Sequence, residues 1–213
     1  MCDRRSVLSR TTRLLPILAL TLVAGCGSSS SVTPGTPSST TTGTAAGGTG
    51  GGALSADAKS AATGDIPDSQ NFLTLAAPQA HVSMIYPEGW TVRDSASLVS
   101  ITDKNNLVHV TLSRGGAPSV SGVQSQLAAL ARATPGLHAR GATAVTLKSG
   151  PAVKVTYTTQ SAPNPVTGKQ VTLTVDRYVL AHGGRMAVID LGTPVGVDNV
   201  DAYRRMIESF RWR

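Results

Sequence analysis

Residues 171–191, VTLTVDRYVLAHGGRMAVIDL, contain two apolar segments separated by a tight turn. The segments 171–180 and 186–191 are rich in β-branched residues, and residues 181–184 include the paired glycines that suit a hairpin turn. We therefore predict an antiparallel hairpin. The apolar alternation shifts within the first arm, which predicts a β-bulge near Asp176–Arg177.

The segments before this hairpin also indicate strands. Residues 81–90, HVSMIYPEGW, alternate in polarity up to a turn at 87–89, and residues 98–112 predict a second hairpin that turns at 103–106. A further strand is expected at 153–159.

Two helices complete the pattern. The first is expected to start at a capping box of Ser121 and Gln124 and to stop before Pro135. Its apolar stripe is Val123, Leu127 and Leu130. The second starts near Asp198, with an apolar stripe of Val200, Tyr203 and Ile207.

The order of these elements, together with a short terminal strand at 210–212, is β-β-β-α-β-β-β-α-β. Because most strands are joined by hairpins, we predict an α+β fold in which helices pack on an antiparallel β-sheet. This domain is expected to span residues 68–213 and to follow a disordered linker. Its length is normal for one domain with one core.

Residues 1–25 have the features of a secretory signal peptide. A basic start precedes an apolar run at 14–24, which is shorter than the roughly 20 residues needed to span a bilayer. The run leads into LVAGC at 22–26, which resembles a bacterial lipobox with Cys26 as the lipidated residue. Arg4–Arg5 resembles a twin-arginine export signal, and export by the general pathway remains an alternative.

Residues 26–67 are expected to form a lipid-bearing, disordered linker. Of the 41 residues from 27 to 67, 35 are Ser, Thr, Gly, Ala or Pro, and none is aromatic. Such a composition cannot bury enough apolar surface to offset the entropy of ordering. The linker is either an unmodified spacer or an O-glycosylated stalk.

This organisation places the protein on the extracytoplasmic face of a bacterial cell membrane, where the lipid on Cys26 anchors it. Because Cys2 leaves with the signal peptide and Cys26 carries lipid, the mature chain would have no disulfide. From residue 70 onward, 14 Lys and Arg face 8 Asp and Glu, an excess that favours anionic envelope partners. The basic residues are scattered, and we exclude nucleic acid as a partner.

Several motifs of the folded part resemble one known kind of domain. IYPEGWTV at 85–92, YVLAHGGRMAVIDLGTP at 178–194 and YRRMIESFRW at 203–212 look like a PsbP-like domain. The layout is similar to that of actinobacterial LpqN/LpqT-type lipoproteins. The resemblance implies a PsbP-like α/β sandwich, an envelope location and a binding or accessory role.

The sequence contains no catalytic motif. The four histidines, His81, His109, His138 and His182, lack the i, i+4 spacing of a helical metal pair, and no cysteine is left to join them. We therefore predict no metal, no cofactor and no enzymatic activity. Asp190 lies among apolar residues of a strand and is more simply explained as an acid on its polar face.

Four residues are candidates for ligand binding. Tyr86 and Trp90 could line a groove, although core packing explains Trp90 equally simply. Arg204 and Arg205 could meet an anionic headgroup, or they could form a solvated helix face.

The predicted function is a non-catalytic binding or accessory role in the envelope, with a lipid or glycolipid as the expected ligand. A protein–protein adaptor is an alternative. A hydrolase with a dispersed active site is a further alternative, for which a concave Ser/His/Asp cluster would be needed.

Overall fold

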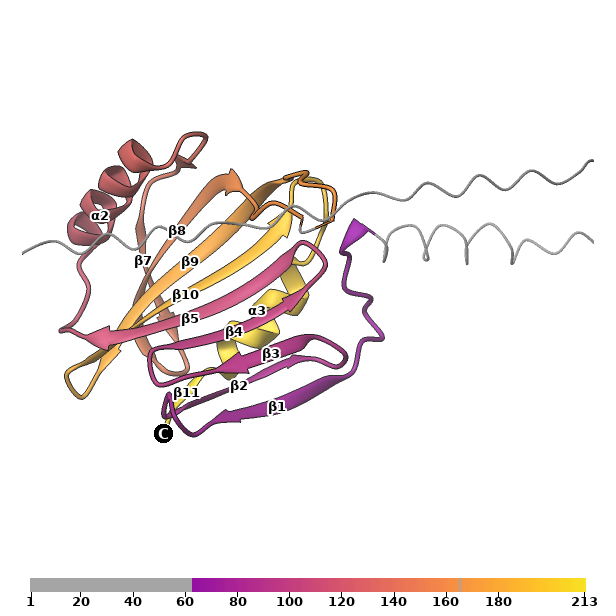
Figure 1. The fold of residues 1–213 in the computed structure, drawn as a ribbon. Coiled ribbons are helices and arrows are strands. Elements are labelled where there is room, and N and C mark those ends of the chain that lie inside the picture. Colours follow the sequence, from indigo (N-terminus) through magenta and orange to yellow (C-terminus); the bar gives the residue numbers. More distant parts are fainter. Residues whose placement is uncertain (1–62, 165) are drawn as a thin grey trace, which may run out of the picture. The chain divides into compact units, whose positions relative to one another are not determined.

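The computed structural model describes residues 63–164 and 166–213. Within this part, antiparallel sheet predominates and two helices pack against it (Figure 1). The predictions for the signal peptide, for Cys26 and for the linker up to residue 62 lie outside the described residues. In residues 63–164 and 166–213, no helix is long and apolar enough to cross a membrane.

The elements follow one another as strands and two helices. Their bounds are β1 (Phe72–Ala77), β2 (Val82–Pro87), β3 (Thr91–Asp94), β4 (Leu98–Asp103), β5 (Asn106–Arg114), α2 (Val120–Ala133), β6 (His138–Ala139), β7 (Thr143–Leu147), β8 (Gly150–Gln160), β9 (Thr172–His182), β10 (Arg185–Pro194), α3 (Val200–Ser209) and β11 (Arg211–Trp212).

The strands form two sheets. One has eight strands, in the order β3-β4-β5-β10-β9-β8-β6, with β7 also pairing with β8. The other has three strands, in the order β1-β2-β11. All of the pairings are antiparallel, as the short connections between most of the strands require.

The hairpin of β9 and β10 lies at the centre of the larger sheet, and it forms as predicted. The predicted bulge does not. Asp176 pairs with Thr156 and Leu191, and Arg177 pairs with Val155 and Asp190, in unbroken register on both sides. The prediction is wrong because the shift in the apolar alternation has another cause, which is burial of both faces of β9.

Each face of the eight-stranded sheet has its own core. On one face, Ala187, Ile189 and Leu191 of β10 pack with α3 and with the three-stranded sheet. On the other face, Val175 and Val179 of β9 pack with α2. Since alternate residues of a strand point to opposite faces, a strand buried on both sides carries apolar residues at both parities.

Helix α2 starts two residues before the predicted cap. Ser119, rather than Ser121, is the N-cap, and its hydroxyl accepts a hydrogen bond from the Gly122 N–H at 3.1 Å. Gln124 accepts from the backbone N–H of Ala142 and so does not close a capping box. Val123 and Leu127 are buried as predicted, and their partner in the predicted stripe, Leu130, is exposed.

In α3 the buried stripe consists of Tyr203, Met206 and Ile207, followed by Phe210 just after the helix. Val200, predicted to belong to this stripe, is 62% exposed. It stands at the first turn of the helix, where the sheet no longer covers it and where a pocket opens instead.

Four strands were not predicted: β1, β3, β6 and β7. Their residues are mostly exposed or half-buried, because these strands lie at or near the sheet edges. A strand without a buried face has no regular apolar alternation, so its sequence carries little signal.

The segment before β1 is bound to the domain by a buried hydrogen-bond network. Asn199 accepts a bond from the Ile66 N–H at 2.8 Å and donates to the Gly64 carbonyl at 3.0 Å and to Thr193 Oγ1 at 2.8 Å. Asn106, at the start of β5, also donates to the Gly64 carbonyl. Both asparagines are 2% exposed, so their polar groups depend on these partners.

The predicted start of the domain at residue 68 is therefore too late. Ile66 is only 8% exposed and belongs to the core on the α3 side. The compositional boundary missed this contact because one isoleucine in a Gly- and Ala-rich tract gives no periodic pattern.

Replacing Ile66 by alanine should lower the free energy of unfolding by about 2 kcal/mol, because a buried side chain is removed. Chemical denaturation of the full chain measures this change. Val166→Ala is a matched control, since Val166 is 91% exposed and should tolerate the change. Equal stability of the two variants would contradict the packing of Ile66.

Candidate ligand-binding site

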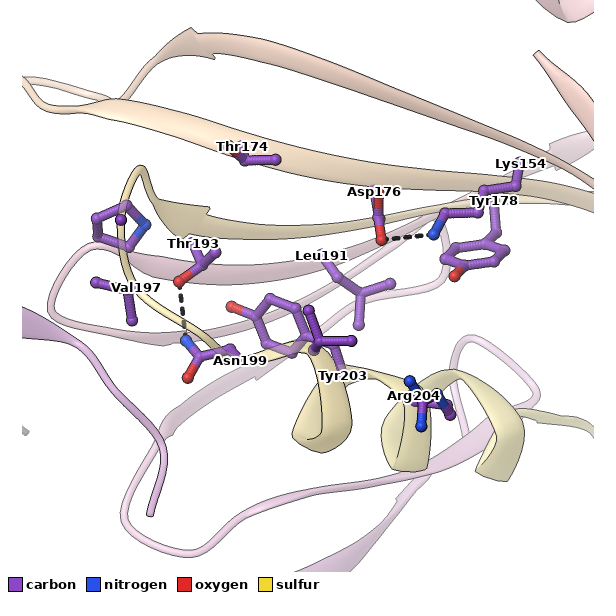
Figure 2. A pocket seen from close by; sticks show the side chains of 13 residues that line it. Lys154, Thr174, Asp176, Tyr178, Leu191, Thr193, Val197, Asn199, Tyr203 and Arg204 are labelled. Carbon is purple, nitrogen blue, oxygen red and sulfur yellow. Dashed lines mark hydrogen bonds and ion pairs between the residues drawn. The ribbon is translucent and has the colours of Figure 1, made fainter. Parts of the chain in front are cut away.

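A pocket of about 340 Å³ lies between the eight-stranded sheet and the start of α3 (Figure 2). Strands β8, β9 and β10 form one side, and residues 194–204 form the other. Its apolar lining includes Leu191, Val197 and Val200.

Contacts between α3 and β10 fix the position of the second wall. The Tyr203 hydroxyl donates to the Gly192 carbonyl at 2.7 Å, and the Asn199 amide donates to Thr193 in the bond drawn in Figure 2. Gly192 is required there, because a Cβ on it would lie 2.9 Å from the Leu107 Cγ atom. The pocket is therefore held open by the fold itself.

A charged pair lies at the other end of the pocket. Lys154 Nζ is 2.8 Å from Asp176 Oδ2, and it lies 5.4 Å from the centroid of the Tyr178 ring (Figure 2). Burial lowers the pKa of Lys154, but the hydrogen bond to Asp176 and the nearby charges outweigh burial and raise this pKa overall. Lys154 therefore stays protonated and can meet an anionic group.

The two tyrosines that line the pocket stay neutral. Burial is the main cause that raises the pKa of Tyr178 and of Tyr203 above the ordinary tyrosine value. The pocket thus presents an apolar centre with hydroxyl groups around it and a cation at one end. This combination suits a ligand that is apolar over most of its length and has one polar or anionic group.

The four predicted ligand residues are dispersed over the domain. Arg204 lines this pocket and forms a 2.8 Å ion pair with Asp201. Arg205, the next residue, lines a different pocket and lies 4.2 Å from the ring centroid of Phe72.

The two aromatic candidates lie away from this pocket. Trp90 and Tyr86 are half-buried and pack against the core on the α3 side. Trp90 also lines a third pocket, together with Glu88 and Asp103. The structure therefore does not bring Tyr86, Trp90 and the two arginines to one groove.

A row of polar side chains crosses the opposite face of the sheet. The Arg177 guanidinium donates to both oxygens of Asp190, at 2.7 Å each, and lies 5.2 Å from the Tyr157 ring centroid. Burial and the charge of Asp190 raise the pKa of Tyr157 to about 12. His109 pairs with Asp190 across β5 and β10, and Ser100 pairs with His109 across β4 and β5.

Ser100, His109 and Asp190 thus stand side by side, but their arrangement is not a catalytic triad. Both carboxylate oxygens of Asp190 are bound by Arg177, so this acid neutralises a half-buried cation. Nor do three His, Cys, Asp or Glu side chains gather as metal ligands anywhere in residues 63–164 and 166–213.

No protein-family model and no curated protein matches this chain. Among solved structures, it is similar to CyanoP, the PsbP protein of the cyanobacterium Synechocystis, with a TM-score of 0.49, 14% identity and coverage of 70% of this chain and 98% of that one. The Ran-binding protein Mog1p of Saccharomyces cerevisiae gives a TM-score of 0.46 and 11% identity, over 67% and 95% of the two chains.

A protein from Bacteroides thetaiotaomicron gives a TM-score of 0.43 and 14% identity, over 66% of this chain and 48% of that one. CyanoP is the kind of domain that the sequence resemblance named. These identities and TM-scores transfer neither a ligand nor an activity to this chain.

Sequence reasoning missed most of the pocket. Lys154 and Asp176 come from different strands, and only the register of β8 and β9 brings them to one place. The available signal was the segment TPVGVDNV at 193–200, in which a Gly- and Pro-containing loop carries three valines. Valines in a connecting loop have no strand or helix to cover them and therefore mark an apolar surface.

The polar row predicts a pH dependence centred on His109. Burial lowers the pKa of His109 below 6.5, and the charge of Asp190 opposes this effect. The folded state therefore binds the proton less readily than the unfolded chain, so the contribution of His109 to stability is lost as the pH falls below about 6.5.

Asp190→Asn should lower the pKa of His109 further, because it removes the opposing charge. Following the imidazole proton shifts by NMR over pH measures both values. The other three histidines, which lie elsewhere, are the internal control for a local effect. A pKa of His109 that rises in the variant would contradict the contact with Asp190.

Proposed function

We propose that this protein is a lipid-anchored binding module of the bacterial cell envelope and that it holds an amphipathic ligand in the pocket between the sheet and α3. The observation that carries the proposal is the pocket itself, with an apolar centre at Leu191 and Val197 and the Lys154–Asp176 pair at one end. Its volume of about 340 Å³ lies in the range of small-molecule sites.

The expected ligand is a lipid or glycolipid of which one part enters the pocket. A volume of this size accepts part of an acyl chain or a small apolar group and leaves the remainder outside. Lys154 and Arg204, on the two walls, are the cations that would meet a phosphate or another anionic group. Each is paired with a carboxylate, so an anionic ligand must compete with Asp176 or Asp201.

Location supports this choice of ligand. The LVAGC motif at 22–26 would place two or more acyl chains on Cys26, and chains in that number anchor a protein stably. A flexible linker of 41 residues would have a root-mean-square reach of roughly 35 Å. The pocket would then stay close to the membrane that supplies the lipid. The similarity to LpqN/LpqT-type lipoproteins agrees with this role.

The anchor can be tested by replacing its cysteine. Cys26→Ser should release the chain from the membrane fraction of bacterial cells into the soluble extracytoplasmic fraction, because serine cannot take up the lipid. Cys2→Ser is the matched control and should leave the protein in the membrane fraction. Retention of the Cys26→Ser chain in the membrane would contradict lipid anchoring.

The pocket can be tested by filling it. Val200 lines the pocket and is largely exposed, so Val200→Trp should be tolerated by the fold and should occupy the space. Anilinonaphthalene sulfonate, which has an apolar ring system and one anionic group, should bind the parent protein, and its affinity should fall about tenfold or more in the variant. Fluorescence titration measures this change.

Val195→Trp is the matched control, because Val195 is 59% exposed in the same loop and does not line the pocket. Native mass spectrometry of protein purified from its own membranes should show a retained lipid that Val200→Trp removes. If neither the dye nor a lipid distinguishes the two variants, the pocket is not the ligand site and an adaptor role becomes the better explanation.

A further inference from the structure

Four arginines gather at the end of the domain that lies farthest from the Asn106–Asn199 network. Arg185 pairs with Arg114 across β10 and β5, and Arg211 pairs with Ser83 across β11 and β2. Arg213 follows directly after β11. We call Arg114, Arg185, Arg211 and Arg213 the basic end. The β9–β10 turn and the C-terminus lie close to each other at the lower left of Figure 1.

Contacts with the turn between β1 and β2 hold this end together. Arg185 Nη2 donates to the Ala80 carbonyl, and the backbone N–H of Arg213 donates to the His81 carbonyl at 2.9 Å. The ring of Trp212 lies 5.2 Å from the Arg185 guanidinium and 6.2 Å from the His182 ring. Three distant parts of the chain therefore converge here.

The charge of the basic end is not neutralised within the domain. In the described part of the chain, the ion pairs involve other side chains. Arg114 and Arg185 are direct neighbours across two strands, and like charges in this position are unfavourable for the sheet. Such an arrangement becomes favourable when an anion lies between the two groups.

The guanidinium groups are also positioned in advance by neutral partners. Arg211 Nη1 donates to the carbonyls of Glu208 and Phe210, and Arg213 Nε donates to Ser83 Oγ at 2.9 Å. Carbonyl and hydroxyl acceptors restrict an arginine without cancelling its charge. The remaining N–H groups stay free to bind phosphate or carboxylate in the forked geometry that arginine favours.

Acidic residues lie at the other end of the same sheet. Two pockets that share Ile66 and Pro67 are lined by six acids, which are Asp65, Asp68, Glu88, Asp103, Asp198 and Asp201. Strand β5 runs from Asn106, near these acids, to Arg114 at the basic end. Eight residue steps at 3.3 Å each separate these ends by roughly 26 Å. The domain is therefore electrically polar along its strands.

We propose that the basic end binds an anionic polymer of the envelope through its phosphate or carboxylate groups. A polymer is favoured over a bilayer because the exposed large apolar side chains of the described residues lie outside the β1–β2 turn, the β9–β10 turn and β11. A surface that docks on a bilayer usually inserts such side chains. This contact is separate from the pocket, so the protein could hold a ligand and a polymer at once.

The test uses the full chain with Cys26→Ser, so that an N-terminal lipid cannot contribute. Inorganic polyphosphate and polyglutamate are the two probes, and they distinguish phosphate from carboxylate as the bound group. The variant Arg114→Gln/Arg213→Gln should weaken binding and should lower the slope of log K against log salt by about two, one for each cation removed.

Arg132→Gln/Arg140→Gln is the matched control, because it removes two exposed arginines from another part of the domain. Its salt slope should equal that of the parent. Arg114→Gln alone, at an exposed position, should lower the slope by about one and guards against a folding defect in the double variant.

Equal losses in the two double variants would show attraction by net charge alone and would overturn the proposal. Vesicles of phosphatidylglycerol are the third probe. If they bind through Arg114 and Arg213 while neither polymer does, the occupant is a bilayer and the proposal is wrong.

Discussion

The fold depends on the burial of both faces of the central hairpin. Strands β9 and β10 contribute alternate residues to two separate cores, one shared with α3 and one shared with α2. Every residue of these strands therefore faces packed protein on one side or the other over most of its length. A polar residue in this position must find a partner within the sheet. Asp176 with Lys154 and Asp190 with Arg177 are the two solutions, one on each face.

These two pairs have different consequences. The Arg177–Asp190 pair is bidentate and about 15–20% exposed, so it is largely closed to ligands and serves the packing of the sheet. The Lys154–Asp176 pair is about one-third exposed and opens into the pocket. The same constraint thus produces a structural pair on one face and a candidate binding group on the other.

The position of α3 decides whether a pocket exists beside Lys154. Asn199 is the N-cap residue of α3, yet its side chain makes no capping bond. It is used instead to join the helix start to Thr193, to Gly64 and to the Ile66 N–H. Leaving any of these buried groups without a partner would cost about 1–3 kcal/mol. The network therefore fixes the first turn of α3, where Val197 and Val200 line the pocket.

The parts of the fold that were predictable from sequence have a single buried face. In β5, Val108, Val110 and Leu112 alternate with less buried residues, so both the strand and its inward face could be derived. In β9 the same method failed at Asp176 and Arg177, because residues of both parities are buried there.

The site was less predictable than the fold, for a related reason. Arg204 was a candidate and does line the pocket, but Lys154 and Asp176 gave no local signal. The network was also hidden, since Asn106 and Asn199 are 93 residues apart and asparagine before a helix or in a turn is ordinarily explained by local bonding. Contacts of this kind depend on sheet register and helix placement, which no local pattern encodes.

The central claim is that the space between the sheet and α3 receives an amphipathic ligand. Methyl NMR of the Cys26→Ser chain during titration with lysophosphatidylglycerol, below its micelle concentration, tests this claim most directly. Saturable shifts of the Leu191, Val197 and Val200 methyl groups are predicted. Shifts confined to Val120 and Val145, which line a different pocket beside α2, would contradict it.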